Sequence, residues 1–192
     1  CDGPLLAGIT ASGEVLTTAG KLPGFSNVKE LHFHWKGIVG VTHDGQVLTC
    51  GDWEDDSFFS SLTDVESLAN MGDEWGCLTK DGTVVFNYDM SAYGAAWTNV
   101  KELRASDHGF YAILHDGTVV SQFELSCSGL SGAAKVVDFE DWLFGISPDG
   151  KLLTQSGGGG LFLCAAGAEA ESHDNNKYDC NSLFHFVNLH SA

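Results

Sequence analysis

The sequence predicts an all-β protein, a five-bladed β-propeller of short antiparallel sheets in a single domain over residues 1–192. Three observations predict it. A hairpin motif occurs five times, a second short strand motif precedes four of these hairpins, and a similar segment lies at the C-terminus. Self-similarity at a fixed period of roughly 20–50 residues indicates a repeat architecture.

The hairpins carry the strongest signal. In each, an Asp-Gly or Ser-Gly pair lies between two apolar runs, and such a pair supplies the positive φ angles of a tight two-residue turn. The predicted hairpins cover residues 8–17, 40–49, 77–86, 112–121 and 145–154. Their turn glycines, which lie 32, 37, 35 and 33 residues apart, are Gly13, Gly45, Gly82, Gly117 and Gly150.

Three columns of the repeat predict where the sheets pack. Five residues before each turn glycine the chain has a small residue, namely Gly8, Gly40, Cys77, Ala112 or Gly145. The next position is always aliphatic, with Ile9, Val41, Leu78, Ile113 and Ile146. Two residues after the glycine come Val15, Val47, Val84, Val119 and Leu152. We expect the small residues where backbones crowd, and the aliphatic columns in the core between adjacent sheets.

A third strand is predicted before each of the last four hairpins, because these segments alternate apolar and polar residues. They are NVKEL (27–31), DVESL (64–68), NVKEL (99–103) and KVVDF (135–139). In the first three the valine lies 17 residues before the turn glycine, whereas the fourth is expected to have a shorter connection.

The first hairpin has no such strand before it. We expect the C-terminal segment FHFVNLHSA, residues 184–192, to pair beside it and close a ring of five units. Closure removes the edge strands that invite aggregation. An open stack of sheets is the alternative, and it would leave both terminal sheets uncapped.

The unit NVKEL…GVTHDGQVLTCGDW resembles the repeat of the regulator of chromosome condensation family and is similar to the secreted propellers of that superfamily that inhibit β-lactamases. The resemblance covers the first hairpin to Ser156 and the last strand. It implies a binding platform whose loops meet a partner. The family usually has seven blades and a Gly-Gln-Leu-Gly after the last strand, which is absent here. Nucleotide exchange and chromatin binding therefore do not carry over.

Composition excludes several classes of function. The chain has 9 basic and 26 acidic residues, a formal charge of −17, which argues against nucleic-acid binding. No apolar run reaches the roughly 20 residues of a membrane-spanning helix. We find no G-x-S-x-G, no H-E-x-x-H and no phosphate-binding loop, so we expect no enzyme activity and no cofactor.

Aromatic residues beside carboxylates are the candidate contact residues. The loops between the first and second strands contain His34, Trp35, His108 and Trp142, and an acidic loop after the second hairpin contains Trp53, Asp55 and Asp56. Such residues anchor protein interfaces or stack on sugars. The alternative for the tryptophans is packing between blades, and for the acidic loop it is solvation. Trp75 aligns with a core column, so we expect it to be buried.

Metal sites are not expected. His32 and His34 share a strand face but have no third ligand at a defined spacing, which disfavours zinc. Residues 173–179 alternate oxygen-bearing side chains but lack the glycine and the terminal glutamate of a calcium loop.

The six cysteines include no C-x-x-C pair, and their even number is compatible with disulfides in a secreted or lumenal protein. The alternative is buried thiols in a reducing compartment. An irregular insert at residues 157–182 breaks the repeat. A bond between Cys164 and Cys180, or from Cys1 to either, would fasten it.

These observations predict a non-catalytic propeller that docks on another protein, either by itself or as an accessory subunit of a multi-subunit complex. The alternative is a lectin with sugar sites between the blades. A lectin is expected to repeat its polar pocket residues in every unit, but here the core columns repeat while the loops diverge. This divergence favours an asymmetric protein interface.

Overall fold

The structure is a computed structural model that describes residues 6–53, 57–89, 97–106, 109–122, 127–139 and 142–154. The chain divides into two units, Cys1–Gly157 and Gly158–Ala192, and all described residues belong to the first. The predicted insert at 157–182, the calcium-like segment 173–179 and the closure strand at 184–192 lie outside the described residues.

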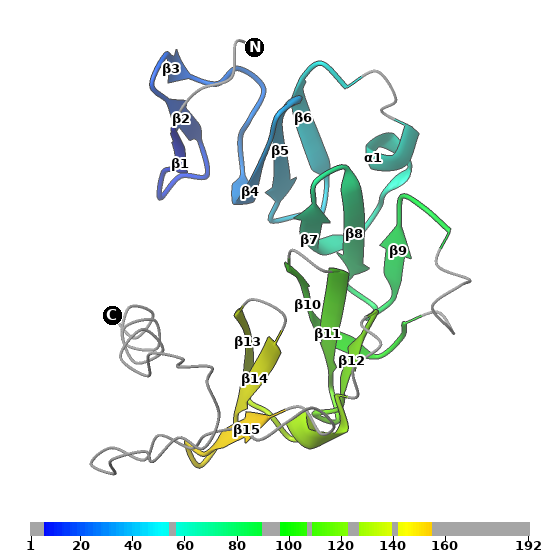
Figure 1. The fold of residues 1–192 in the computed structure, drawn as a ribbon. Coiled ribbons are helices and arrows are strands. Elements are labelled where there is room, and N and C mark those ends of the chain that lie inside the picture. Colours follow the sequence, from blue (N-terminus) through cyan, green and yellow to red (C-terminus); the bar gives the residue numbers. More distant parts are fainter. Residues whose placement is uncertain are drawn as a thin grey trace, which may run out of the picture. The chain divides into compact units, whose positions relative to one another are not determined.

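Five three-stranded antiparallel sheets follow one another along the described chain (Figure 1), so the all-β prediction is confirmed. The first sheet contains β1 (Ala7–Ile9), β2 (Val15–Thr17) and β3 (Gly20–Lys21). The second contains β4 (Val28–His34), β5 (Gly37–Thr42) and β6 (Val47–Gly51), and the third β7 (Val65–Met71), β8 (Glu74–Thr79) and β9 (Val84–Phe86). The fourth contains β10 (Val100–Ser106), β11 (Gly109–Leu114) and β12 (Val119–Ser121), and the fifth β13 (Lys135–Phe139), β14 (Trp142–Ile146) and β15 (Leu152–Thr154).

All five predicted hairpins are present, as β1–β2, β5–β6, β8–β9, β11–β12 and β14–β15. The predicted preceding strands are β4, β7, β10 and β13, and each pairs with the first strand of its hairpin. The first sheet instead adds β3 after its hairpin. The short helix α1 (Ser57–Ser61) and a 3₁₀ turn at Ser128–Leu130 were not expected from the sequence.

The expectation of a shorter connection between the fourth of these strands and its hairpin is wrong. Val136 lies opposite Gly145, just as Leu31 lies opposite Gly40 in the second sheet. Val136 is therefore the counterpart of Leu31, and the counterpart of Val28 is Ala133, 17 residues before its turn glycine. A small residue at the valine position made the motif appear three residues later.

The first four turn glycines bind the next repeat through their backbone. The carbonyl oxygens of Gly13, Gly45 and Gly82 accept hydrogen bonds from the amides that open the following sheets, at Val28 (2.9 Å), Val65 (3.0 Å) and Val100 (2.9 Å). The Gly117 carbonyl accepts instead from the amide of Gly132, the residue before Ala133, at 2.8 Å. One backbone hydrogen bond thus links each described sheet to the next.

Residues in the left-handed region make this junction possible. Asn27, Asp64 and Asn99 precede the three valines with φ of 58°, 53° and 60°. Their carbonyl oxygens accept from His43, Lys80 and His115, which precede the turns of their own sheets. Asparagine and aspartate are among the few non-glycine residues that adopt this conformation readily.

The core consists of clusters between consecutive sheets, as the aliphatic columns predict. Val15 of the first sheet packs with Val28 and Ile38 of the second, and Val41 of the second with Val65 and Trp75 of the third. The next two junctions are filled in the same way by the clusters around Leu78, Val84 and Val100 and around Ile113, Val119 and Val136. At the two ends of the described chain the predicted burial is wrong, because Ile9 and Leu152 are exposed.

Within the described ranges, no helix is long and apolar enough to cross a membrane.

Gly45→Ala tests the junction between the second and third sheets. Gly45 has φ of +89°, and a Cβ there would lie 2.9 Å from the Val65 amide nitrogen. Gly24 has φ of +81°, but a Cβ there would meet nothing within 4 Å. We expect Gly24→Ala to cost about 1 kcal/mol from backbone strain alone. Gly45→Ala should cost at least about 2 kcal/mol in urea unfolding, because the junction must also open. Equal costs would contradict the role of the close approach.

Candidate functional site

The two-residue turn between β4 and β5 holds Trp35 and Lys36 in a fixed position. His34 and Gly37 pair across it, and the Asp52 amide donates a 2.8 Å hydrogen bond to the Lys36 carbonyl oxygen. Gly37 has φ of +150°, and a Cβ there would overlap the carbonyl oxygen of Cys50 on β6. The turn is therefore fastened directly onto the end of the sheet.

This turn exposes two large aromatic side chains. Trp35 is 77% exposed and Phe33 is 50% exposed. The Lys36 ammonium lies 5.0 Å from the centroid of the Trp35 ring, within cation–π range, and 3.9 Å from the Asp73 carboxylate on the β7–β8 turn. We call Phe33, Trp35, Lys36 and Asp73 the docking surface.

An aromatic cluster lies beneath the docking surface, in which Phe59 and Trp75 are buried and Trp53 is partly buried. The His34 side chain is only 3% exposed and stacks on Trp53, with ring centroids 5.2 Å apart and planes at 26°. Both rings lie 6.0 Å from Trp75, and Phe59 of α1 meets Trp53 and Trp75 edge to face at 5.1 Å. Such geometry adds stability beyond the area it buries.

His34 connects this cluster to the surface. Its Nδ1 accepts a 3.3 Å hydrogen bond from the Lys36 amide, so the neutral ring carries its proton on Nε2. Nε2 lies 3.2 Å from Asp73 Oδ1 without an aligned hydrogen bond. The Trp53 indole nitrogen is likewise buried, with no hydrogen-bond partner among the described residues.

The turn that carries Asp73 is fastened from the other side. Asn87, just after β9, donates from Nδ2 to the Asp73 carbonyl oxygen at 2.9 Å. Its Oδ1 accepts from the Trp75 amide at 2.8 Å. Asp73 is therefore held beside His34 by the third sheet, while Trp35 is presented by the second.

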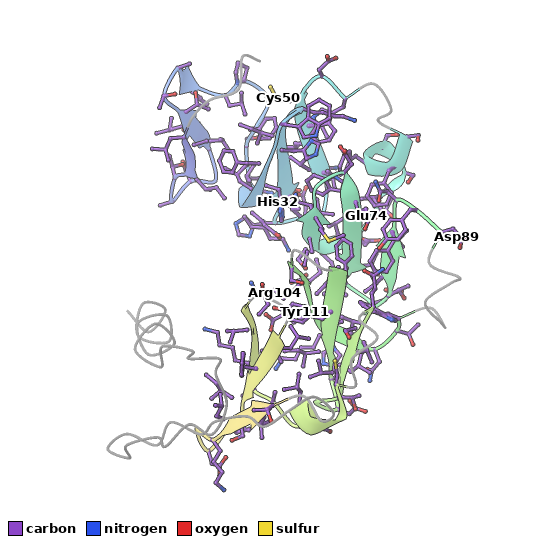
Figure 2. All side chains as sticks on the ribbon, viewed as in Figure 1. His32, Cys50, Glu74, Asp89, Arg104 and Tyr111 are labelled. Carbon is purple, nitrogen blue, oxygen red and sulfur yellow. The ribbon has the colours of Figure 1, made fainter. Side chains whose placement is uncertain are left out.

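His32 has a structural environment. In His32, which is labelled in Figure 2, Nε2 lies 2.6 Å from Glu30 Oε1 and Nδ1 lies 3.3 Å from Asn70 Oδ1. The His32 ring also packs edge to face with the Trp75 ring. A second link between sheets is the 3.2 Å hydrogen bond that the Tyr111 hydroxyl donates to Asp138. Among the described residues, no group of three or more His, Cys, Asp or Glu is placed to hold a metal ion.

The predicted contact residues differ in their exposure to solvent. Trp35 is exposed as expected, and the expected burial of Trp75 is confirmed. His34 and Trp53, predicted as contact residues, instead support the turn from within the aromatic cluster. Trp142 begins β14, but its side chain is outside what the structure describes. The remaining predicted residues also lie outside the described ranges: Asp55, Asp56, His108, Cys1, Cys164 and Cys180.

Phe33, Lys36 and Asp73 lie in the loops between first and second strands that the sequence predicts as contact loops, but the sequence did not single them out individually. The alternation along β4 gave a signal for Phe33, because His32 and His34 face one side of the strand and Phe33 faces the other. The proximity of Lys36 and Asp73 depends on how two sheets meet, and no local pattern contains it.

The described thiols are packing groups. Cys77 and Cys127 are buried, and the Cys127 sulfur lies 3.2 Å from the Ser121 hydroxyl oxygen. Burial, with the nearby charge of Glu30, raises the pKa of the Cys77 thiol to about 12, so it carries its proton at neutral pH. Cys50 is disulfide-bonded, and its partner lies outside the described residues.

The turn aspartates are structural, as expected from the Asp-Gly pairs of the predicted hairpins. The Thr42 hydroxyl is the main cause that lowers the Asp44 pKa, and Asn27 Nδ2 adds a 2.9 Å hydrogen bond. Hydrogen bonds from turn residues also lower the pKa of Asp81, Asp116 and Asp149. These carboxylates remain charged acceptors at neutral pH.

No protein-family model and no curated protein matches this chain.

Two alanine variants should distinguish a residue that stabilises the fold, His34, from one that is exposed on the surface, Trp35. We expect His34→Ala to lower the free energy of unfolding by about 2–4 kcal/mol, because it empties a buried aromatic site. Trp35→Ala should change it by no more than about 0.5 kcal/mol, because the side chain is 77% exposed. Urea unfolding followed by far-UV circular dichroism measures both. A large loss from Trp35→Ala would show that this ring is part of the core.

Lowering the pH should remove the contribution of the turn aspartates to the free energy of unfolding. The Thr79 hydroxyl, 2.6 Å from Asp81, is the main cause that lowers the pKa of this carboxyl below 3.8. A lowered native pKa gives stability above the unfolded value, and this stability is lost as the pH falls through the native pKa. The difference in unfolding free energy between the wild type and Asp81→Asn should therefore be constant near neutral pH and shrink below about pH 4. A difference independent of pH would contradict this assignment.

Proposed function

We propose that the chain is a non-catalytic module that docks on another protein through the docking surface. The observation that supports this most is the 77% exposure of Trp35 on a turn fixed by backbone contacts. Tryptophan dominates the energetics of many protein interfaces, where its ring enters a desolvated pocket of the partner. A monomeric protein gains nothing from leaving such a ring in water.

The rigidity of the turn favours binding. Trp35 and Phe33 belong to a paired hairpin whose end is fixed by the Asp52–Lys36 hydrogen bond and by the His34 ring below. A side chain that is already ordered loses little conformational entropy on association. This arrangement suits an anchor residue.

Charge indicates the character of the partner. The exposed carboxylates of Asp52 and Asp73 flank the turn, Lys36 is its one cation, and the whole chain carries a formal charge of −17. A partner with arginine or lysine side chains would be attracted by this field, and a guanidinium stacks well on an indole face. We therefore propose a partner protein with a basic contact surface.

A sugar-binding role is the second candidate. An exposed indole beside the Asp73 carboxylate has the chemistry of a sugar platform, because one stacks on apolar faces and the other accepts hydroxyl hydrogen bonds. The equivalent turn of the third sheet, however, has Gly72 and Asp73 where the second has Trp35 and Lys36. This difference between the two described turns favours a protein interface over a set of equivalent lectin sites.

Two further features belong to this proposal. We place the protein in a secreted or lumenal setting, as a separate module or an accessory subunit, and the disulfide at Cys50 supports an oxidising compartment. We also propose that the five sheets form a propeller of the type found in the regulator of chromosome condensation family. The shared register of the second to fifth sheets supports this.

The partner can be captured with a photoreactive phenylalanine analogue at position 35, and its affinity then measured with variants of the full chain. We expect Trp35→Ala to weaken binding about 30-fold, the equivalent of about 2 kcal/mol. Val85→Ala is the matched control, because Val85 is an exposed apolar residue on β9, away from the turn. Asp73→Asn should reduce the salt dependence of binding if the partner is basic.

Two results would contradict the proposal. One is unchanged affinity of Trp35→Ala for the captured protein. The other is the absence of any cross-linked protein together with glycan-array binding that Trp35→Ala abolishes, which would establish the sugar-binding role instead.

A further inference from the structure

The Lys36 side chain places its ammonium between an exposed indole ring and an exposed carboxylate. The ammonium nitrogen lies 5.0 Å from the centroid of the Trp35 ring and 3.9 Å from Asp73 Oδ1. The second contact joins two sheets, because Trp35 and Lys36 form the β4–β5 turn and Asp73 belongs to the β7–β8 turn. A ring face with a carboxylate beside it attracts cations in general, and nothing in this arrangement is particular to lysine.

The turn itself does not require a cation at this position. His34 pairs with Gly37 across the β4–β5 turn, and Met71 pairs with Glu74 across the β7–β8 turn in the same way. Lys36 and Asp73 are therefore equivalent residues of two similar turns. Because the third sheet forms the same turn with a carboxylate, the positive charge of Lys36 serves its contacts rather than the backbone conformation.

The Lys36 side chain can move away while the turn stays in place. The Lys36 amide donates to His34 Nδ1 at 3.3 Å, and the Lys36 carbonyl oxygen accepts from the Asp52 amide at 2.8 Å. The His34 ring also supports the Trp35 ring, with centroids 5.4 Å apart. None of these contacts involves the ammonium, so the site keeps its shape when Lys36 leaves.

Both groups that contact the ammonium are open to a competing cation. The Trp35 side chain is 77% exposed and the Asp73 side chain is 67% exposed. Contacts of an exposed ammonium with an indole and with a carboxylate are each weak. A guanidinium is planar and less strongly hydrated than an ammonium, so it stacks on an indole and at the same time donates to a carboxylate. It is therefore expected to replace Lys36.

We propose that the Trp35 ring and the Asp73 carboxylate form a binding site for one arginine side chain of a partner protein, and that Lys36 fills this site until the arginine displaces it. This inference rests on the proposed function and adds to it the ligand group and a competitor within the chain. Lys36 lowers the affinity of the site for every cation, so only a group that binds better than an ammonium occupies it.

A short arginine peptide tests the site in the full chain without the partner protein. The probe is acetyl-Gly-Arg-Gly-amide, and the signal is the NMR resonance of the Trp35 indole N–H, identified by its loss in Trp35→Phe. We expect the peptide to shift this resonance. The same peptide with citrulline, which has nearly the shape of arginine but no charge, should leave the resonance in place.

The Lys36 side chain gives a direct signal of displacement. Protons above the face of an indole resonate upfield of their usual positions, because the ring current opposes the applied field. We expect the Lys36 methylene resonances to move downfield, toward those of an exposed lysine, as the arginine peptide is added. The citrulline peptide should not move them.

Two lysine variants distinguish competition at the site from a change in net charge. Lys36→Gln should lower the dissociation constant of the arginine peptide about 3–10-fold, because it removes the competing contacts. Lys29→Gln is the matched control, since Lys29 lies on the same sheet and pairs with one carboxylate, that of Glu66, at 3.5 Å. It removes the same charge and should change the dissociation constant by less than about 2-fold. In the Lys36→Gln chain, Asp73→Asn should remove most of the gain.

Three results would overturn the inference. They are an unshifted Trp35 indole resonance when the arginine peptide is added to Lys36→Gln, equal tightening by Lys36→Gln and Lys29→Gln, and Lys36 methylene resonances that stay upfield while the indole resonance shifts. Each of these leaves the proposed function standing as long as the captured partner still needs Trp35. A captured partner that binds Trp35→Ala as well as the wild type would overturn the proposed function itself.

Discussion

The fold depends on the hydrogen bond from the amide that opens each repeat to the carbonyl of the preceding turn glycine. The bond from Val65 to Gly45 forms only because Gly45 has no Cβ and Asp64 adopts a left-handed conformation. These sheets are too small to bury an apolar face alone, and the junction brings the aliphatic columns of two sheets together. Their stability therefore resides between the sheets, as expected for a repeat protein.

The candidate site is built over one of these junctions. His34 and Trp53 belong to the second repeat, Asp73 and Trp75 to the third, and the Val65–Gly45 bond sets how they meet. The packing of four aromatic rings there, of which Trp53 is partly buried, supports the turn that carries Trp35. The exposed anchor is thus a consequence of the packing below it, while the thiols and turn carboxylates nearby have structural partners.

At the two ends of the described chain, apolar residues of the core columns are exposed to solvent. Leu6, Ile9 and Leu152 occupy core columns but remain exposed, because no described segment covers them. In the middle repeats the same columns are buried by a connecting segment of regular spacing.

The sequence by itself determined the hairpins, the strands that precede them and most of the core columns, because turn chemistry and strand alternation are local properties that recur at the same offsets. It misplaced the start of the fifth repeat, where Ala133 replaces a valine and only the register against Gly145 identifies it. It selected Trp35 but assigned His34 and Trp53 to the surface. Only the tertiary structure decided which aromatic rings are buried and placed Asp73 beside Lys36, because burial depends on contacts between residues far apart in the chain.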